Sequence, residues 1–371
     1  MSTSDPIKVM MLSTSYPADS LDWKGTFIRN MLEALANNGS VELSVWQPAG
    51  EIPLNVRECM STSDSQWLAR LLDSGGIAHQ LRTSPVKGVI SAAKLIGRMR
   101  QACLRETQTD LWHVNWLQNA LAVPSDRKGL VTTALGMDLA LLKIPGIVWQ
   151  LRRKFRNRKT VICPNSRWME KNLKEHFGDV SEIQYLPFGI DEKWYQVLRT
   201  PSKRKRWLCV TRITPEKIGD LFDWSHSIFT QSELELHLIG PNQSGLKIPD
   251  WIHYHGSVSP NALRQNWFSS STGLITLSRH SEGRPQVMME AMASGMPVIA
   301  SDLIAHADFI DHGKTGWICS DKETFVNGIK ILSKEQNNKK IGENARHSIR
   351  SISGNWSTYT NRLFEIYSSI A

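Results

Sequence analysis

The stretch Ser278-Arg-His-Ser-Glu-Gly-Arg-Pro-Gln-Val-Met-Met-Glu-Ala-Met-Ala-Ser-Gly-Met-Pro-Val-Ile-Ala-Ser301 decides the fold of this chain. The apolar run at residues 273–277 leads into it and predicts a strand. Pro285 stands where the first residue of a helix is expected, and Gly295 stands where that helix ends. Residues 297–301 are apolar again and predict a second strand. Strand, helix and strand in this order predict a βαβ unit with parallel strands.

The same alternation extends outward into both halves of the chain. Apolar runs that predict strands are separated by segments with helical spacing, so the expected fold class is α/β, with two doubly wound, Rossmann-like domains. The strands expected outside the opening stretch cover residues 7–14, 41–47, 111–114, 130–135, 161–164, 207–211, 234–239 and 253–256.

A break in composition separates the two halves. The segment Leu186–Asp191 is rich in turn formers, and residues 200–206 are strongly basic. We therefore expect an N-terminal domain over residues 1–190, a linker over 191–205 and a C-terminal domain over 206–355. A last helix within residues 356–371 is expected to pack on a domain or to cross back to the N-terminal one.

Composition narrows the class of protein. The 371 residues are 41% hydrophobic and 21% charged, and no run of about 18 apolar residues could span a bilayer. The N-terminus does not resemble a secretory signal, so a cytoplasmic location is expected. The five cysteines have no metal-ligand spacing and are interpreted as reduced thiols. The net charge of +9 fits anionic nucleotides, anionic lipid surfaces or nucleic acid, and charge alone does not choose among them.

Two carboxylates in the opening stretch are the strongest candidates for a site. Glu282 lies in the loop after a strand, where open α/β sheets bind ligands. The first amides of the next helix, at Gln286 and Val287, are suited to a phosphate or a sugar oxygen. Glu290 lies more than a turn further along that helix. Carboxylates repel phosphate but accept hydrogen bonds from hydroxyls, so the pair indicates a sugar and a ribose.

Glu282 and Glu290, with Glu-Ala-Met-Ala-Ser-Gly-Met-Pro-Val-Ile following, resemble the E-x7-E signature of retaining glycosyltransferases of family 4, which have the GT-B fold. The resemblance implies two domains facing a cleft. It also implies a catalytic contact of Glu282 with the donor sugar and binding of the nucleotide ribose by Glu290. Gly283, beside the first Glu, is placed with the donor-binding residues.

The segment Val210-Thr-Arg-Ile-Thr-Pro-Glu-Lys217 looks like the family's pair of cations that clamp the donor diphosphate. The resemblance implies that role for Arg212 and Lys217. Two fixed cations can stabilise the charge that grows on a departing nucleoside diphosphate. The sequence contains no D-x-D pair, so we expect no metal ion and no other cofactor.

The resemblance reaches the N-terminal half more thinly. Gly25 lies in a loop where family members bring a glycine close to the diphosphate, although an ordinary turn explains it as well. His113 matches a family His near the acceptor, with a structural His as the alternative. Asp138 lies in a loop where the family often has His-Gly-x-Asp, and Leu135 occupies the position of that His. Asp138 either faces the cleft as a catalytic residue, which orients the acceptor or stabilises positive charge on the sugar ring, or caps the next helix.

The sequence therefore predicts a hexosyl-type glycosyltransferase that moves a sugar from a nucleotide-diphosphate donor, with retained anomeric configuration. The expected acceptor is a glycan or a lipid-linked glycan held by the N-terminal domain. The apolar and basic segment Leu141–Lys159 is a candidate for an anionic membrane surface, with an ordinary surface helix as the alternative. The rival functions are a sugar-nucleotide epimerase and a non-enzymatic binding protein. The sequence contains no recognisable nucleic-acid-binding motif.

Overall fold

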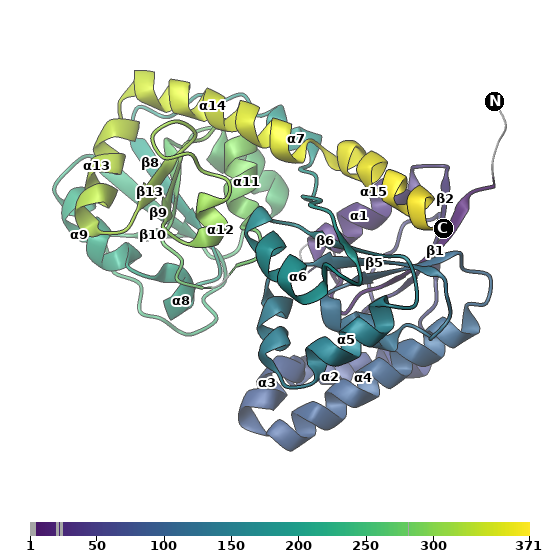
Figure 1. Cartoon of the computed structure of the whole chain (residues 1–371). Coiled ribbons are helices and arrows are strands. Elements are labelled where there is room, and N and C mark those ends of the chain that lie inside the picture. The colour runs from purple at the N-terminus through teal and green to yellow at the C-terminus, as the bar shows by residue number, and fades with distance from the viewer. Residues whose placement is uncertain (1–4, 20–21, 23–24, 281) are drawn as a thin grey trace. The chain divides into compact units, whose positions relative to one another are not determined.

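The computed structural model describes residues 5–19, 22, 25–280 and 282–371, and these form two compact units. Unit 1 comprises the chain up to Phe188 together with Trp356–Ala371, and unit 2 comprises Gly189–Asn355. The chain therefore leaves unit 1 once and returns to it in its last helix (Figure 1). Each unit is described here by itself.

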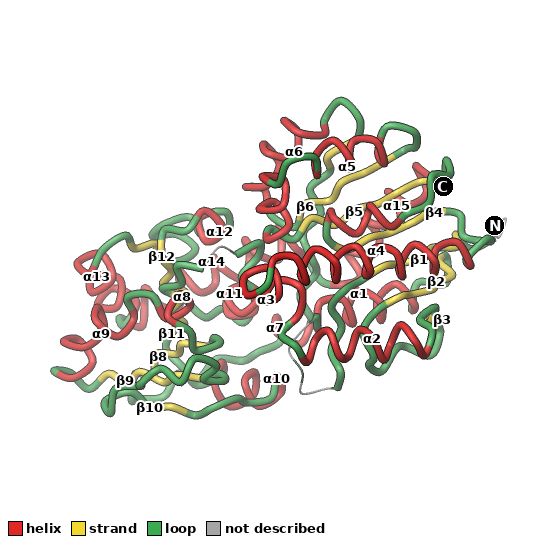
Figure 2. The backbone as a smooth tube through the Cα atoms, turned by 90° about the horizontal axis from the view of Figure 1, so that it is seen from below, coloured by secondary structure: helices red, strands yellow, loops and turns green. Residues whose placement is uncertain are grey.

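Unit 1 is built on a parallel sheet of the order β3-β2-β1-β4-β5-β6-β7. The order reverses between β1 and β4, which is the Rossmann arrangement. Its strands run side by side in Figure 2. They are β1 (Ile7–Leu12), β2 (Val41–Trp46), β3 (Val56–Glu58), β4 (Leu111–Asn115), β5 (Gly129–Ala134), β6 (Thr160–Pro164) and β7 (Glu182–Ile183).

Helices cover both faces of this sheet because alternate strand residues point to opposite faces and apolar residues occur on both. One face packs against α2, α4, α5 and α6, and the other packs against α1 and α15. The helices of unit 1 are α1 (Thr26–Ala36), α2 (Thr62–Asp73), α3 (Gly76–Thr83), α4 (Pro85–Arg105), α5 (Ile147–Phe155), α6 (Glu170–Phe177) and α15 (Trp356–Ile370), with short 3₁₀ helices η1 (Leu117–Ala122), η2 (Met137–Lys143) and η3 (Arg167–Met169).

Helix α15 is an integral part of unit 1. Its residues Tyr359, Leu363 and Tyr367 are fully buried in the core beside α1. Gly129, at the start of β5, is in such close contact that an added Cβ would lie 2.5 Å from the carbonyl oxygen of Ile370. The last turn of the chain is therefore fitted directly against a central strand.

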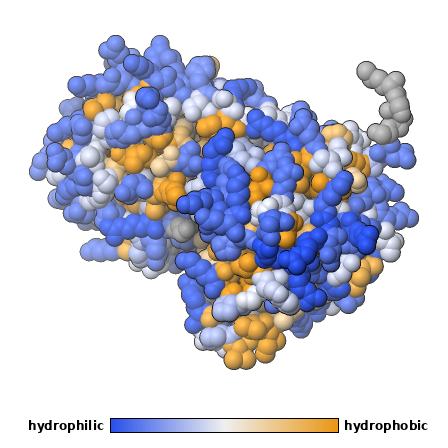
Figure 3. Space-filling model, viewed as in Figure 1, coloured by the Kyte–Doolittle hydropathy of each residue, from blue (hydrophilic) through white to orange (hydrophobic). Residues whose placement is uncertain are grey.

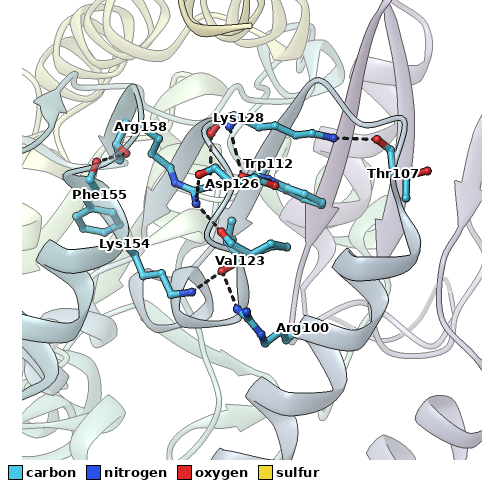
Figure 4. Close-up of polar contacts among 11 residues, drawn as sticks. Arg100, Thr107, Trp112, Val123, Asp126, Lys128, Lys154, Phe155 and Arg158 are labelled. Carbon is cyan, nitrogen blue, oxygen red and sulfur yellow. Dashed lines mark hydrogen bonds and ion pairs between the residues drawn. The ribbon is translucent and has the colours of Figure 1, made fainter.

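Composition alone would predict that the basic segment around α5 is a charged face exposed to solvent. In the structure several of its cations instead bind the backbone and side chains of a neighbouring loop. Lys154 Nζ and Arg100 Nη1 both donate to the carbonyl oxygen of Val123, at 2.5 and 3.3 Å (Figure 4). Arg158 forms an ion pair with Asp126 at 3.1 Å. Burial, and then the neighbouring arginine charges, lower the pKa of Lys154 to about 8. These cations fix the loop that leads into β5.

Unit 2 repeats the architecture with a parallel sheet of the order β10-β9-β8-β11-β12-β13. Its strands are β8 (Lys205–Val210), β9 (Leu234–Ile239), β10 (His253–Tyr254), β11 (Gly273–Thr276), β12 (Val298–Ser301) and β13 (Trp317–Cys319). Its helices are α7 (Glu192–Tyr195), α8 (Pro215–Ile218), α9 (Leu221–Thr230), α10 (Pro260–Ala262), α11 (Gln286–Ala293), α12 (Ile304–Ala307), α13 (Lys322–Leu332) and α14 (Glu335–Ser353), with a π-helical turn η4 (Leu263–Phe268).

The two sides of the second sheet are again covered. Helices α11 and α14 pack on one face, and α9 and α13 pack on the other. Both units are therefore doubly wound α/β domains, as the sequence predicts. Among the described residues, no helix has the length and apolar character needed to cross a membrane.

Candidate functional site

The candidate site of unit 2 lies where its strand order reverses. Strands β8 and β11 are neighbours, paired through Trp207 with Gly273 and Leu208 with Leu274, and the chain leaves both at the same edge of the sheet. A crevice forms at such a switch point because the following helices go to opposite faces. The loops after β8 and β11 contain the cations and the carboxylate singled out by the sequence.

These two loops are tightly joined. The amide of Arg279 donates to the carbonyl oxygen of Glu216 at 2.7 Å. Gly219 has φ of 54°, and an added Cβ would lie 2.0 Å from the carbonyl oxygen of Leu277, so only glycine fits there. Thr214 caps α8 by accepting a hydrogen bond from the amide of Lys217. These backbone contacts thus fix the position from which the side chain of Lys217 extends.

Lys217 and Glu282 form an ion pair across the two loops. Lys217 Nζ lies 2.7 Å from Glu282 Oε1, and the two side chains are 15% and 12% exposed. Burial opposes ionisation of Glu282, but the ammonium of Lys217 outweighs it and holds the pKa of the carboxyl below its usual value. Glu282 is therefore a carboxylate at neutral pH, able to accept hydrogen bonds from hydroxyls.

Arg212 and His280 complete this charged group. Arg212 follows β8 by two residues. Burial first, and then the positive charges of Lys217 and Arg212, lower the pKa of His280, so the imidazole stays neutral beside these cations. The structure thus brings Arg212, Lys217 and Glu282 together in one unit.

Helix α11 supplies the second half of the site. It begins at Gln286, with Pro285 at the N-cap in an extended conformation, so the expectation that Pro285 is the first helical residue is wrong by one position. The reason is the ψ of 92° at Pro285, which is outside the helical range. The amides of Gln286 and Val287 lie in the first turn, where no intrahelical acceptor exists. Gly283 lies in the loop between Glu282 and this helix.

Glu290 is on α11, one turn beyond Gln286, whose side-chain amide donates to it at 3.2 Å. Burial raises the pKa of Glu290 to about 7, against the opposing influence of Gln286 and the charge of Arg284. Arg284 is itself directed to Ser353, with Nη2 2.8 Å from Oγ. Glu282 and Glu290 therefore differ in character: one is firmly ionised, and the other titrates near neutrality.

The remaining predicted residues belong to unit 1. Gly25 precedes α1 with φ of 67°, and an added Cβ would lie 2.7 Å from the amide nitrogen of Tyr16, so the position requires glycine. The neighbouring Trp23 and Lys24 of the predicted loop lie outside the described residues. His113, on β4, is completely buried, with its ring nitrogens 2.6 Å from Tyr367 Oη and 2.8 Å from Thr133 Oγ1. Both nitrogens are used within the core.

Asp138 lies inside η2, two residues after its N-cap Gly136, and is 2% exposed. Its carboxylate accepts hydrogen bonds from the amides of Leu117 and Leu135, both at 3.1 Å. Burial raises the pKa of Asp138, and these backbone donors oppose the shift. The carboxylate therefore joins the loops after β4 and β5 rather than capping the helix that follows.

Sequence reasoning missed two residues next to these groups. Trp116, directly after β4, has φ of 68° and ψ of 132° and is the one non-glycine residue with positive φ in the described part of the chain. His306 is fully buried, with Nδ1 3.1 Å from Ser301 Oγ, and burial lowers the pKa of its imidazole. No motif marks either one, because a single aromatic or histidine carries no periodic signal.

Across residues 5–19, 22, 25–280 and 282–371, no group of three His, Cys, Asp or Glu side chains is arranged to bind a metal ion.

Comparison with known proteins identifies the family to which this chain belongs. Residues 204–335 match the model of the glycosyl transferases group 1 family. The chain is 33% identical over 280 residues to N-acetyl-alpha-D-glucosaminyl L-malate synthase of Bacillus anthracis, covering 69% of this chain and 73% of that relative.

Solved structures share the fold. Sucrose-phosphate synthase of Thermosynechococcus elongatus superposes with a TM-score of 0.73 at 16% identity, covering 98% of each chain. HepE of Anabaena in complex with UDP-glucose superposes with a TM-score of 0.65 at 15% identity, covering 98% of this chain and all of that one. The predicted GT-B fold is thereby confirmed. With its two Rossmann-like units and a carboxylate held by a lysine at the switch point of the second, the chain belongs to the group 1 family of glycosyltransferases.

Proposed function

We propose that this glycosyltransferase moves a hexosyl group from a nucleoside-diphosphate sugar bound by unit 2 to a hydroxyl of an acceptor bound by unit 1, with retention of configuration. The observation that carries the proposal is the ion pair between Lys217 and Glu282 at the β8/β11 switch point. It places an ammonium and a carboxylate at hydrogen-bonding distance from each other. A nucleotide-sugar donor needs such a pair, because its diphosphate binds a cation and the hydroxyls of its sugar bind a carboxylate.

In this proposal each charged group binds a different part of the donor nucleotide sugar. Lys217 has three donors, so it can hold Glu282 and a phosphate oxygen at once, and Arg212 binds the same diphosphate. Glu282 accepts from sugar hydroxyls, and Glu290 accepts from the ribose. The cations and the first amides of α11 stabilise the charge that develops on the leaving diphosphate, so no metal ion is needed.

Retention follows from which groups are suited to the proton transfer. An inverting transfer needs a base on the face opposite the leaving group, and Leu135 stands where family members often have a His. In the retaining route, the acceptor oxygen bonds to the anomeric carbon as the bond to the phosphate oxygen breaks. The acceptor proton passes to that departing oxygen. The name of the Bacillus anthracis relative specifies an alpha-linked glucosaminyl product, which supports this choice.

Asp138 is assigned a positioning role on the acceptor side. It fixes the amide of Leu117, directly after Trp116, at the β1/β4 switch point of unit 1. Strained backbone at a strand end is characteristic of ligand sites. Trp116 is half-buried with its ring centroid 6.1 Å from that of Phe27, and in this proposal its indole packs on a sugar ring of the acceptor.

The acceptor proposed is a glycan or a lipid-linked glycan, used at the cytoplasmic face of a membrane. The Bacillus anthracis relative is named for L-malate, so a small hydroxy acid is the second candidate acceptor. Both present a hydroxyl to the same chemistry, and an acceptor panel separates them.

The test combines product analysis with variants. An α-linked nucleotide sugar is expected to give an α-linked product, read from the coupling constant of the anomeric proton, and a β-linked first product would refute retention. Glu282→Ala is expected to lower turnover and Glu290→Ala to weaken nucleotide binding, each by about tenfold or more. Arg212→Ala and Lys217→Ala should each slow transfer. Wild-type kinetics in these variants would contradict the assignment of the donor site to unit 2.

The rival functions are separated in the same assay. An epimerase would change the sugar nucleotide without any acceptor, and a binding protein would release no nucleoside diphosphate under any condition. Transfer that depends on acceptor excludes both.

A further inference from the structure

Helix α4 presents an apolar stripe on the surface of unit 1. Val86, Val89 and Ile90 are 72%, 61% and 61% exposed. Spacings of three and four residues put them on one face of the helix, and the exposed Ala93 continues that face by a further turn. Figure 3 shows apolar atoms gathered at the tip of unit 1 where Figure 1 places the beginning of α4.

The opposite face of α4 satisfies its packing needs without this stripe. Gly88, Leu95 and Met99 are buried, and Gly88 is so close to α3 that an added Cβ would lie 2.7 Å from the amide nitrogen of Leu81. The helix is therefore anchored in the core through one face, and the stripe is an additional apolar surface that the fold of unit 1 does not use.

The charges around the stripe are of one sign. Residues 74–105 contain six Lys or Arg residues and no Asp or Glu. Arg98 and Arg105 are directed to Asp64 on α2, at 2.5 and 3.7 Å. Lys87 and Lys94 are exposed on α4 beside the stripe. Apolar residues that alternate with lysines on one helix match an anionic lipid surface, with the side chains below the headgroups and the ammonium groups among the phosphates.

We infer that the first half of α4 docks unit 1 on an anionic membrane, with Val86, Val89 and Ile90 entering the interface. A stable protein partner would require about 800 Å² on each side, far more than these few side chains provide. Shallow insertion into lipid needs no such area, and the charge of the segment is complementary to anionic headgroups. The inference deepens the proposed membrane location of the acceptor, and it names the surface that meets the membrane.

This surface differs from the segment Leu141–Lys159 considered from the sequence. In the structure α5 buries Leu151 and Phe155, and of the large apolar residues in this segment only Ile144, which precedes α5, and Trp149 are strongly exposed. Arg153 lies over the ring of Trp149, 5.0 Å from its centroid. Membrane contact through α5 stays a prediction, and Trp149 provides a comparison variant.

Vesicle flotation of the full chain tests the inference. Vesicles of phosphatidylcholine alone are compared with vesicles that also contain phosphatidylglycerol. The wild type should float with the anionic vesicles and should bind neutral ones at least tenfold more weakly. The triple variant Val86→Ser, Val89→Ser, Ile90→Ser should lose at least tenfold in binding to anionic vesicles. Lys87→Gln and Lys94→Gln should each cost about fivefold at low salt and less at high salt.

Matched controls are the single variants Leu54→Ser and Leu198→Ser, whose side chains are 103% and 85% exposed outside α4. They should bind as the wild type does. Equal binding to neutral and anionic vesicles, loss of binding with Trp149→Ser alone, or retained binding in the triple variant would each overturn the inference. So would a wild-type dimer in sedimentation that the triple variant abolishes without any vesicle binding.

Donor turnover in detergent-free solution is measured in parallel, because α4 takes no part in donor binding. Activity with no flotation overturns the docking surface and leaves the proposed transfer standing. Flotation that depends on α4 without transfer supports the docking surface and overturns the proposed function.

Discussion

Glu290→Gln separates the cost of burying a charge from its use in binding. The carboxyl of Glu290 has a pKa of about 7 in the folded protein, against 4.5 for an unperturbed Glu. Between these values the folded state holds a proton that the unfolded state has lost. Stability from this group is therefore highest below about pH 4.5, falls as the pH rises to about 7 and is flat above it.

The magnitude follows from the difference in pKa. A shift of 2.5 units, the difference between the two values, corresponds to about 3 kcal/mol, which is an upper bound for the cost of the buried charge at pH 8. Gln has nearly the same shape and no charge. The variant should therefore exceed the wild type in stability by less than about 1 kcal/mol at pH 5 and by up to about 3 kcal/mol at pH 8. Nucleotide binding should move in the opposite direction, about tenfold weaker at pH 8.

The assay is urea unfolding followed by tryptophan fluorescence at several pH values from 5 to 8, with nucleoside-diphosphate binding measured alongside. Glu343→Gln, at an exposed position on α14, is the matched control and should change neither quantity. A stability difference between wild type and Glu290→Gln that is the same at pH 5 and pH 8 would refute the reasoning. A variant that gains stability and keeps full nucleotide affinity would remove Glu290 from the ribose site.

Four further outcomes are expected. Trp116→Gly should be more stable than Trp116→Ala by about 1 kcal/mol in thermal unfolding, because only glycine adopts the positive φ without strain. A more stable Ala variant, which is the usual order, would show that the backbone at position 116 is not strained. Lys217→Met should lower kcat/KM by at least about tenfold, and Lys217→Arg should recover part of it, since a cation beside Glu282 is retained; equal loss in both variants contradicts a charge-based role. Asp138→Asn should reduce kcat more than donor affinity, because the substitution removes the charge and turns one of the two oxygens that accept from the amides of Leu117 and Leu135 into an NH2 donor; unchanged kcat would leave Asp138 without influence on transfer. EDTA should leave activity unchanged, and restoration of a lost activity by magnesium or manganese would overturn metal independence.

Much of the architecture could be predicted from periodicity and turn chemistry. The strand ending at Thr276 and the helix ending near Gly295 follow from the opening stretch to within a residue or two. By contrast, the sequence between the second and fourth strands gave no assignment for α2, α3 and α4. Their spacing of buried residues is interrupted by the exposed apolar stripe of α4, so the pattern does not separate a core face from a surface face.

The candidate donor site was predictable because its residues cluster in motifs. Lys217 and Glu282 are 65 positions apart, yet parallel strands bring their loops to one edge. The character of each group was not predictable. Burial makes Glu290 titrate near neutrality while Lys217 keeps Glu282 ionised, and sequence carries no measure of burial. His113 shows the same limit, since its core hydrogen bond to Tyr367 joins residues 254 positions apart.

The return of the chain to unit 1 has a consequence for how the protein is made. Helix α15 completes a core whose remaining residues, the last of them Phe188, are synthesised earlier, so a ribosome must translate the whole of unit 2 before unit 1 can close. Until then the α1 face of the first sheet is exposed to water and to chaperones. A fragment ending at Phe188 is expected to aggregate, whereas unit 2, continuous from Gly189 to Asn355, is able to fold while its tether is still incomplete.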